Sequence, residues 1–168
     1  AVDTGVVVAV TAADGTLLWV EGDLAARRRA EQMNFVPGAD WSEDSAGTNA
    51  PGTALALGRP VQIFGPEHLL RPVTPWSCSA APIREPDTGA ILGVLDLTGG
   101  PEVAGPQTLA LVRATVAAVE AELRINRLTA PYAATGDTNH GPSTLPRLEV
   151  LGRRSALFSY PGTTTELS

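Results

Sequence analysis

The sequence predicts an α+β fold, and three observations support that prediction. A β-branched segment, Gly5–Thr11, and a second strand-like segment, Thr16–Glu21, flank an Asp-Gly pair, which favours a tight hairpin turn because glycine tolerates positive φ. Two further strand-like segments, Ser77–Ile83 and Ala90–Thr98, flank a connection with proline, aspartate and glycine as turn residues. A long helix is expected over 106–129, because a proline suits its first turn and another proline follows its end.

The opening hairpin is apolar on both of its faces. Leu17 and Trp19 lie on one side of the second strand, and Leu18 and Val20 lie on the other. Strands that are apolar on both sides are typical of a sheet covered on both faces. We therefore expect both opening strands to be central in such a sheet.

A capped helix is expected after the hairpin. Asp23 can cap a helix over 24–33, in which Arg27–Arg29 interrupt the apolar positions. The arginine run is interpreted either as a solvated face or as a regulatory anion site. Residues 34–40 contain a Pro-Gly pair and are expected to form a loop.

Short elements are expected next along the chain. A helix over 47–58 tolerates Pro51 in its first turn and ends on Gly58. Residues 61–64 read as a short strand, and residues 67–70 as about one helical turn.

The two strands that follow carry several polar residues. If their connection closes a regular hairpin, Ile83 faces Ala90 and Ser77 faces Asp96. Asp96 would then lie among apolar neighbours, where a carboxylate needs donors such as the Ser77 hydroxyl. Asp96 is interpreted either as a hydrogen-bonded structural anchor or as a pocket acid.

The long helix carries one continuous apolar seam. Its members are spaced three and four residues apart: Leu109, Val112, Val116, Val119 and Leu123. The seam can pack on the sheet, or it can form a dimer contact that carries a signal onward. One helix can do both if Leu111, Ile125 and Leu128 widen the stripe.

The composition excludes several classes of protein. With 43% hydrophobic and 18% charged residues, the 168-residue chain can bury a core. A net charge of −6 argues against a grip on a phosphate backbone, which needs a basic stripe. A single cysteine excludes an internal disulfide framework and fits a reducing cytoplasm. We expect neither a secretory signal nor a membrane span.

The chain is expected to divide into three parts. Residues 1–130 form one domain, and residues 131–145, which are rich in Ala, Thr, Gly and Pro, form a linker. Residues 146–168 read as three short strands, too few to bury a core of their own. They are interpreted as the start of a truncated second domain, and the chain as a piece of a longer protein.

The stretch from Trp41 to Gly100 combines large apolar side chains with many polar ones. Such a mixture is typical of a small-molecule pocket. The chain holds no G-x-S-x-G elbow, no phosphate-binding G-x-x-x-x-G-K-S/T and no G-x-G-x-x-G after a strand. We therefore expect a binding domain and not an enzyme.

Five short motifs in this chain resemble a known family. They are Gly47-Thr48-Asn49-Ala50, Gly52-Thr53-Ala54-Leu55, Glu67-His68-Leu69, Cys78-Ser79-Ala80-Ala81-Pro82-Ile83 and Gly93-Val94-Leu95-Asp96-Leu97-Thr98-Gly99. In this order they resemble a GAF domain, of the branch found as sensor region in transcriptional regulators related to the acetoin-catabolism activator. The resemblance covers about residues 5–129.

The resemblance implies an α/β sandwich, with a central antiparallel sheet of five or six strands and helices on both faces. It implies a cytoplasmic regulator whose GAF domain binds a small molecule and whose 106–129 helix passes the state to a DNA-binding output domain. It also implies a homodimer through that helix. The truncated second domain resembles the leading strands of a winged-helix domain, so DNA would be bound only outside this piece. No membrane contact is expected.

The family's pocket lies between the sheet and the loops and helices that cover it. Carried onto this chain, the resemblance places seven residues near the pocket: Trp19, Trp41, Phe64, His68, Trp76, Cys78 and Asp96. It names no ligand, since GAF pockets accept nucleotides, haem, bilins, 2-oxoacids and small ketones.

Three alternatives stay open beside ligand sensing. His68 could ligate haem iron or join Glu67 and Cys78 around a metal ion, or it could be a hydrogen-bonded structural histidine. Cys78 could sense oxidants if its thiolate were stabilised, or it could be a small buried residue. The domain could also be a ligand-free dimerisation module. The favoured interpretation includes no cofactor and no metal.

Overall fold

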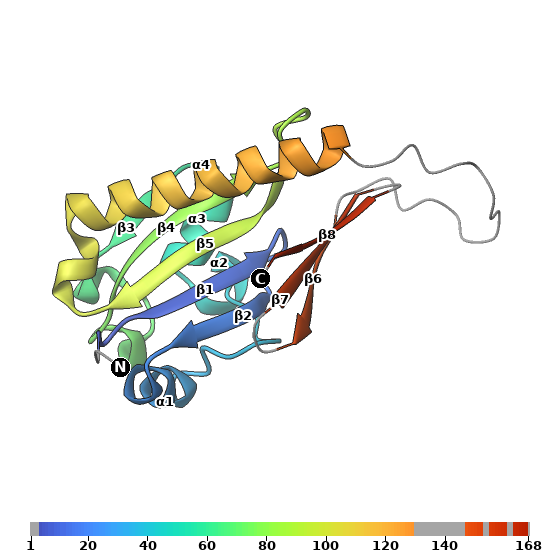
Figure 1. Ribbon diagram of the computed structural model, residues 1–168. Helices are drawn as coiled ribbons and strands as arrows, with labels where there is room; N and C mark the ends of the chain where they lie inside the picture. The colour runs from blue at the N-terminus through green and yellow to red at the C-terminus, as the bar shows by residue number, and fades with distance from the viewer. Residues whose placement is uncertain (1–3, 130–146, 153–154, 161–162, 168) are drawn as a thin grey trace.

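A five-stranded antiparallel sheet forms the centre of the molecule (Figure 1). The structure is a computed structural model that describes residues 4–129, 147–152, 155–160 and 163–167. The strands are β1 (Val7–Ala12), β2 (Leu17–Gly22), β3 (Val61–Ile63), β4 (Ser77–Arg84) and β5 (Ile91–Gly99). They lie in the order β2-β1-β5-β4-β3, and each neighbouring pair is antiparallel. The predicted α+β class is therefore confirmed.

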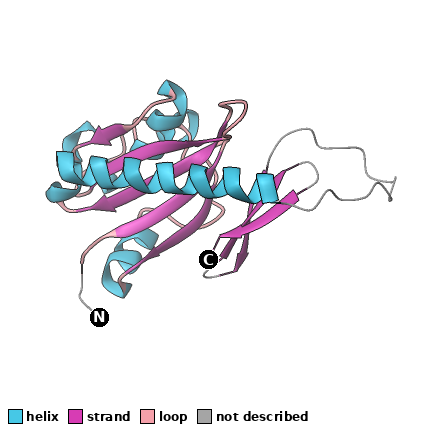
Figure 2. Cartoon of the chain, turned by 45° about the horizontal axis from the view of Figure 1, so that its top comes forward, coloured by secondary structure: helices cyan, strands magenta, loops and turns pink. Residues whose placement is uncertain are grey.

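Helices cover both faces of this sheet, as the resemblance implied. They are α1 (Leu24–Gln32), α2 (Glu43–Ala46), α3 (Ala50–Leu57) and α4 (Pro106–Thr129), with 3₁₀ turns η1 (Gly65–Glu67), η2 (Arg71–Val73) and η3 (Pro101–Ala104). The first three helices lie on one face, and α4 runs across the other (Figures 1 and 2). Three clusters of buried apolar side chains result among the described residues, two on the α1–α3 face and one beneath α4.

Side-chain caps and a left-handed glycine set the ends of the helices. The Asp23 carboxylate accepts a hydrogen bond from the Ala26 N–H at 2.8 Å and starts α1, as predicted. The Asn49 side chain does the same for α3 through the Gly52 N–H at 2.9 Å. Gly58 ends α3 with φ of 62°, a conformation that glycine adopts without strain.

Two short helical segments differ from the prediction. Helix α2 was not predicted, because four residues are too few to show a helical period. The turn predicted over 67–70 is wrong, and the 3₁₀ turns η1 and η2 lie on either side of it. Each of these 3₁₀ segments has a proline among its first two residues, a position that proline tolerates.

The apolar seam of α4 packs on the sheet. Val112, Val116 and Leu123 are buried, and they contact β4 and β5 residues such as Ala81 and Leu95. Packing of the predicted seam on the sheet is therefore confirmed.

The position of β2 corrects one expectation. Strand β1 pairs with β2 on one side and with β5 on the other, so β2 is an edge of the five-stranded sheet. The expectation that both opening strands are central was wrong for β2. The apolar pattern of β2 does not show whether this strand is at the edge or in the centre of the sheet. That depends on which strand pairs with the other side of β1, and this strand, β5, is more than 70 residues away in the sequence.

The register between β4 and β5 also differs from the prediction. Ser77 pairs with Gly99, and Ala80 pairs with Asp96, a displacement of three residues from the regular hairpin. The Glu85 carboxylate accepts hydrogen bonds from the N–H groups of Asp87 and Thr88 in the connection, and a β-bulge between Ile83 and Arg84 adds the third residue of the displacement. Side chains alternate between the two faces of a strand, so a displacement by an odd number of residues reverses the expected facing. Asp96 therefore faces α1–α3 and not α4.

A separate three-stranded antiparallel sheet lies toward the end of the chain. It contains β6 (Arg147–Gly152), β7 (Ser155–Tyr160) and β8 (Thr163–Leu167), which confirms the three strands expected there. The predicted linker over 131–145, with His140, lies outside the described residues. Within the described part of the chain, no helix has the length and apolarity that a membrane crossing needs.

Candidate functional site

A small cavity lies between the sheet and the layer that contains α1 and α3. Ten residues line it: Met33, Phe35, Trp41, Asn49, Ala50, Pro51, His68, Val73, Cys78 and Thr98. Its volume, counted as the space open to the centre of a water-sized sphere, is about 10 Å³. This is close to the volume that one water molecule needs. None of the lining side chains carries a permanent positive charge.

The floor of the cavity is polar and is supplied by two neighbouring strands. Cys78 on β4 and Thr98 on β5 are paired across the sheet and therefore point to the same side. The Thr98 hydroxyl donates to Asp96 Oδ2 at 2.5 Å and lies 3.1 Å from Cys78 Sγ. A hydroxyl has one proton and two lone pairs, so Thr98 can accept the thiol proton of Cys78 while it donates to Asp96.

Asp96 lies beneath this floor and is fully buried. Its Oδ1 has no hydrogen-bond partner in the structure. Burial raises the pKa of the Asp96 carboxyl to about 7, and the hydrogen bond from Thr98 only partly opposes this shift. Near neutral pH a large fraction of Asp96 is therefore an uncharged acid that can donate as well as accept.

His68 closes one side of the cavity from the loop between η1 and η2. Its Nδ1 lies 2.9 Å from the Gly65 carbonyl, and this acceptor assigns the proton to Nδ1. Nε2 then acts as an acceptor, 3.6 Å from Cys78 Sγ. Burial lowers the pKa of the His68 imidazole, which favours the neutral ring at this position.

Cys78 is a protonated thiol in these surroundings. Burial, and secondarily the charge of Asp96, raise the pKa of the Cys78 thiol well above its ordinary value. Reactive sensor cysteines need the opposite environment, one that favours the thiolate. The geometry therefore favours the interpretation of Cys78 as a small buried lining residue.

Aromatic side chains form the roof of the cavity. Phe35 and Trp41 pack edge to face, with ring centroids 4.9 Å apart and planes at 80°. The Trp41 Nε1–H donates to the Asn34 carbonyl at 3.1 Å, which ties the indole to the segment after α1. The site thus combines an aromatic roof with a floor of polar side chains whose polar atoms do not reach the cavity surface.

A wider cleft opens beside the cavity. It offers about 380 Å³ to the centre of a water-sized sphere and is lined by Arg29, Gln32, Met33, Pro72, Pro75, Trp76, Gly99 and Gly100. The Arg29 guanidinium lies over the Trp76 ring, 4.9 Å from its centroid. This volume lies within the range of small-molecule sites.

The structure brings together some of the seven residues expected near the pocket. Trp41, His68 and Cys78 line the cavity, and Asp96 contacts it through Thr98. Trp76 lines the adjoining cleft.

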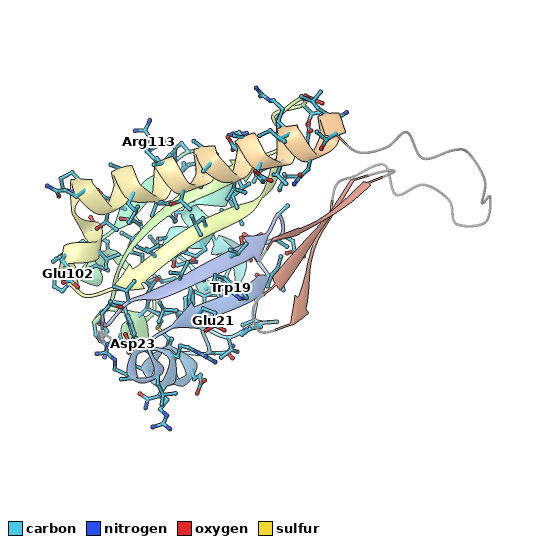
Figure 3. All side chains as sticks on the ribbon, in the orientation of Figure 1. Trp19, Glu21, Asp23, Glu102 and Arg113 are labelled. Carbon is cyan, nitrogen blue, oxygen red and sulfur yellow. The ribbon has the colours of Figure 1, made fainter. Side chains whose placement is uncertain are left out.

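The other two expected residues lie elsewhere. Trp19 on β2 (Figure 3) pairs with Val10, which faces the α4 side of the sheet, so its side chain lies on the opposite face from the cavity. Phe64 follows β3 and is 49% exposed. Their aromatic character was visible in the sequence, whereas their facing depended on pairing and on chain direction.

The sequence interpretation did not include several lining residues. Met33 and Phe35 come from the end of α1 and the loop after it, and Val73 comes from η2. Thr98 could have been found by alternation with Asp96 in β5, because residues two apart in one strand share a face in any register. No periodic signal marks the loop residues.

The described residues do not form a metal site. Among them, no three His, Cys, Asp or Glu side chains gather closely enough to hold a metal ion. The cavity beside His68 is also far smaller than a haem.

Comparisons with known proteins agree with the sequence motifs. The chain is 57% identical over 152 residues to a protein of Rhodococcus erythropolis, the "Uncharacterized 47.3 kDa protein in thcA 5'region". The matched region covers 90% of this chain and 33% of that protein. It is 43% identical to the acetoin dehydrogenase operon transcriptional activator AcoR of Bacillus subtilis, over 66% of this chain and 18% of AcoR. It is 39% identical to the propane 2-monooxygenase operon transcriptional activator MimR of Mycolicibacterium smegmatis, over 73% of this chain and 21% of MimR. The chain thus spans about a third or less of the length of these relatives.

A solved structure shares the fold. The crystal structure of the E. coli DhaR(N)-DhaL complex contains a chain that matches with a TM-score of 0.72 at 21% identity, over 77% of this chain and 44% of that chain. The named relatives are transcriptional activators and not enzymes, as the motif search predicted. Residues 1–121 match the family described as "MimR, N-terminal domain". The chain therefore belongs to this family of regulatory N-terminal domains of transcriptional activators.

Proposed function

We propose that this chain is the ligand-sensing domain of a cytoplasmic transcriptional regulator, and that its ligand is a small uncharged molecule. The observation that carries the proposal is the small cavity, whose surface is apolar and whose lining side chains include no cation. Two relatives activate operons whose names contain acetoin dehydrogenase and propane 2-monooxygenase, and acetoin and propane are both small and uncharged.

The chemistry of the lining supports an uncharged ligand. A buried carboxylate or phosphate needs a cation, and the cavity lining contains none. The polar side chains among the lining residues are instead His68, Cys78 and Thr98, whose polar atoms lie just behind the cavity surface. These groups suit a ligand with one or two carbonyl or hydroxyl oxygens.

Contacts between the site strands and α4 offer a route for the signal. Strands β4 and β5 carry the cavity floor on one face and the packing surface of α4 on the other. At the far end of β4, the Arg84 N–H donates to Glu120 of α4 at 2.7 Å. Arg127 of α4 pairs with Glu85 at 2.9 Å. A ligand that favours one sheet geometry would thereby bias the position of α4.

A test of the ligand site is a variant that fills the cavity. We expect acetone or acetoin, used as probes, to give saturation-transfer NMR signals with the wild-type domain and to raise its melting temperature by several degrees at saturating concentration. Val73→Leu adds a methylene group to a lining residue and should weaken the binding of both probes at least tenfold. Val116→Leu, a matched change on the opposite face, should bind them as the wild type does. Equal binding by both variants, or no binding by the wild type, would contradict the proposal.

We also propose that α4 joins two copies of the domain. Its outward face carries a second apolar stripe with 3-4-3-4-3 spacing: Leu111, Ala114, Ala118, Ala121, Ile125 and Leu128. Every member of the stripe is exposed, and Leu128 is 79% exposed. Arg113, beside the stripe, points away from the sheet (Figure 3). The central alanines permit close approach of a second helix, and the larger residues at the ends fill the diverging space.

A charge in the centre of the stripe tests the dimer. We expect the wild-type domain to have the mass of a dimer by size exclusion with light scattering, and Ala118→Glu to raise the dimer dissociation constant at least tenfold. Ala25→Glu introduces the same charge at an exposed alanine of α1 and should leave the mass unchanged. A monomeric wild-type domain, or a dimeric Ala118→Glu variant, would rule out this contact. A dimer without ligand binding would favour the dimerisation-module alternative.

The DNA-binding function belongs, in this proposal, to a domain beyond the sensor. Strands β6–β8 would be the leading strands of that output domain, of winged-helix type, joined to the sensor through the segment after α4. The acidic charge of the chain supports the separation of sensing from DNA contact.

A further inference from the structure

We infer that Met33 separates the small inner cavity from the outer cleft, that ligands reach the cavity from this cleft, and that the Met33 side chain sets the size of ligand the site accepts. The inference deepens the proposed function and rests on it for the identity of the site.

The cavity and the cleft are consecutive along the same three elements. At the end of α1, Gln32 lines the cleft and Met33 lines both spaces. In η2, Pro72 lines the cleft and Val73 the cavity. At the end of β5, Gly99 lines the cleft and Thr98 the cavity. The two spaces therefore lie end to end in one channel, and Met33 is the side chain that borders both.

The sizes of the two spaces make this boundary decisive. The cavity has room for about one water, whereas the cleft offers about 380 Å³. A ligand with four or more heavy atoms does not fit in the cavity as it stands. A rotation of Met33, which lies at the margin of the core on the α1–α3 face, toward the cleft would enlarge the cavity.

The local structure lets this side chain move on a fixed backbone. Met33 is the C-cap of α1, and its N–H bonds to the Ala30 carbonyl at 3.1 Å. Asn34 follows in the left-handed region with φ of 60° and is held through its carbonyl by Trp41. Methionine is unbranched, so its rotation costs less than the movement of a branched or aromatic wall residue.

The mouth of the channel lies along one face of α1. Arg29 is one helical turn before Met33, so the two side chains are neighbours on that face. The Arg29 guanidinium over Trp76 narrows the cleft in front of Met33. A molecule in the cleft therefore contacts both Trp76 and Met33.

The sole cysteine provides a test that needs no ligand. Cys78 lies in the cavity floor and is buried, so its labelling rate reports how often small molecules reach the cavity. Methyl methanethiosulfonate, a small neutral reagent, reacts with the thiolate to form a methyl disulfide and releases methanesulfinate. We expect Met33→Ala to label at least ten times faster than wild type at pH 8, and Met33→Leu, which keeps the wall, to label at close to the wild-type rate.

Global unfolding also exposes Cys78, and a control on the other face accounts for it. Leu123→Ala removes a buried side chain of α4 and destabilises the domain without touching the channel. Its labelling rate, compared at matched stability in mild urea, gives the contribution of unfolding. If Met33→Ala labels no faster than Leu123→Ala at equal stability, Met33 is not the barrier and the inference fails.

A second measurement separates failure of the inference from failure of the proposed function. We expect the wild-type domain to bind acetone and to bind cyclohexanone weakly, and Met33→Ala to bind cyclohexanone at least ten times more tightly. If acetone binds and cyclohexanone binding is unchanged by Met33→Ala, the site stands and the size filter is refuted. If neither ketone binds either protein, the proposed ligand site itself is refuted, together with the size filter.

Discussion

Replacing Trp41 with alanine will lower the free energy of unfolding by about 3–5 kcal/mol, the range for removal of a large buried aromatic side chain. Trp41 is 4% exposed and packs against Phe35 at 4.9 Å between ring centroids. The substitution also leaves the Asn34 carbonyl without its indole donor. Urea unfolding followed by far-ultraviolet circular dichroism measures the change.

Removal of an exposed side chain of the same molecule provides the comparison. Leu128 is 79% exposed on α4, and Leu128→Ala should change the unfolding free energy of the monomer by less than about 0.5 kcal/mol. The measurement is made at a protein concentration below that of dimer formation. A loss below about 1 kcal/mol for Trp41→Ala would mean that the roof of the cavity is not part of the stable core.

Replacing Asp96 with asparagine will change how stability depends on pH. Burial raises the pKa of Asp96 in the folded protein to about 7, from an ordinary value of 3.8. Between these two values the folded state holds a proton that the unfolded chain has released. Wild-type stability therefore contains a contribution that is fully present below pH 4 and is lost as pH rises toward 7.

Asparagine resembles the neutral acid and has no such titration. The unfolding free energy of Asp96→Asn relative to wild type should rise by about 1.4 kcal/mol per pH unit across this window. The total gain should reach at most about 4 kcal/mol at pH 8, which is the whole shift in pKa converted to free energy. Urea unfolding at pH 4, 5, 6, 7 and 8 gives the curve.

Comparing the unfolding free energy of Asp96→Asn with that of wild type removes the contribution of His68. Burial lowers the pKa of His68, so its effect on stability has the opposite sign and increases toward pH 6.5. Because both proteins contain His68, the difference between them isolates Asp96. Asp44→Asn, an exposed change in α2, should show no comparable trend with pH. A difference curve for Asp96→Asn that is flat from pH 4 to 8 would show that Asp96 is ionised in the fold.

The site was partly predictable because its motifs lie on regular elements. His68 and Cys78 were identified from the motifs that resemble GAF domains, and both line the cavity. Trp19 was placed near the pocket as an aromatic residue of a strand, but it pairs with Val10 on the opposite face. Met33 and Phe35 were not expected, because they follow the end of a helix where no period specifies direction.

The sequence by itself determined the local elements. The Asp-Gly pair gave the first hairpin, Asp23 and Gly58 marked helix ends, and the spaced apolar residues of α4 specified the face that packs on the sheet. Each of these features depends on residues close together in the chain. The same motifs also indicated the family of regulators.

Only the tertiary structure decided which side chains share the cavity. The connection displaces the pairing of β4 with β5 by two residues and a β-bulge between Ile83 and Arg84 adds a third, and this odd displacement places Asp96 and Thr98 on the face that carries Cys78. The segment after α1 then brings Met33 over a floor that lies more than 40 residues away in sequence. A period of two residues specifies that neighbours alternate, but it does not specify which face meets which helix, since that choice depends on contacts between distant segments.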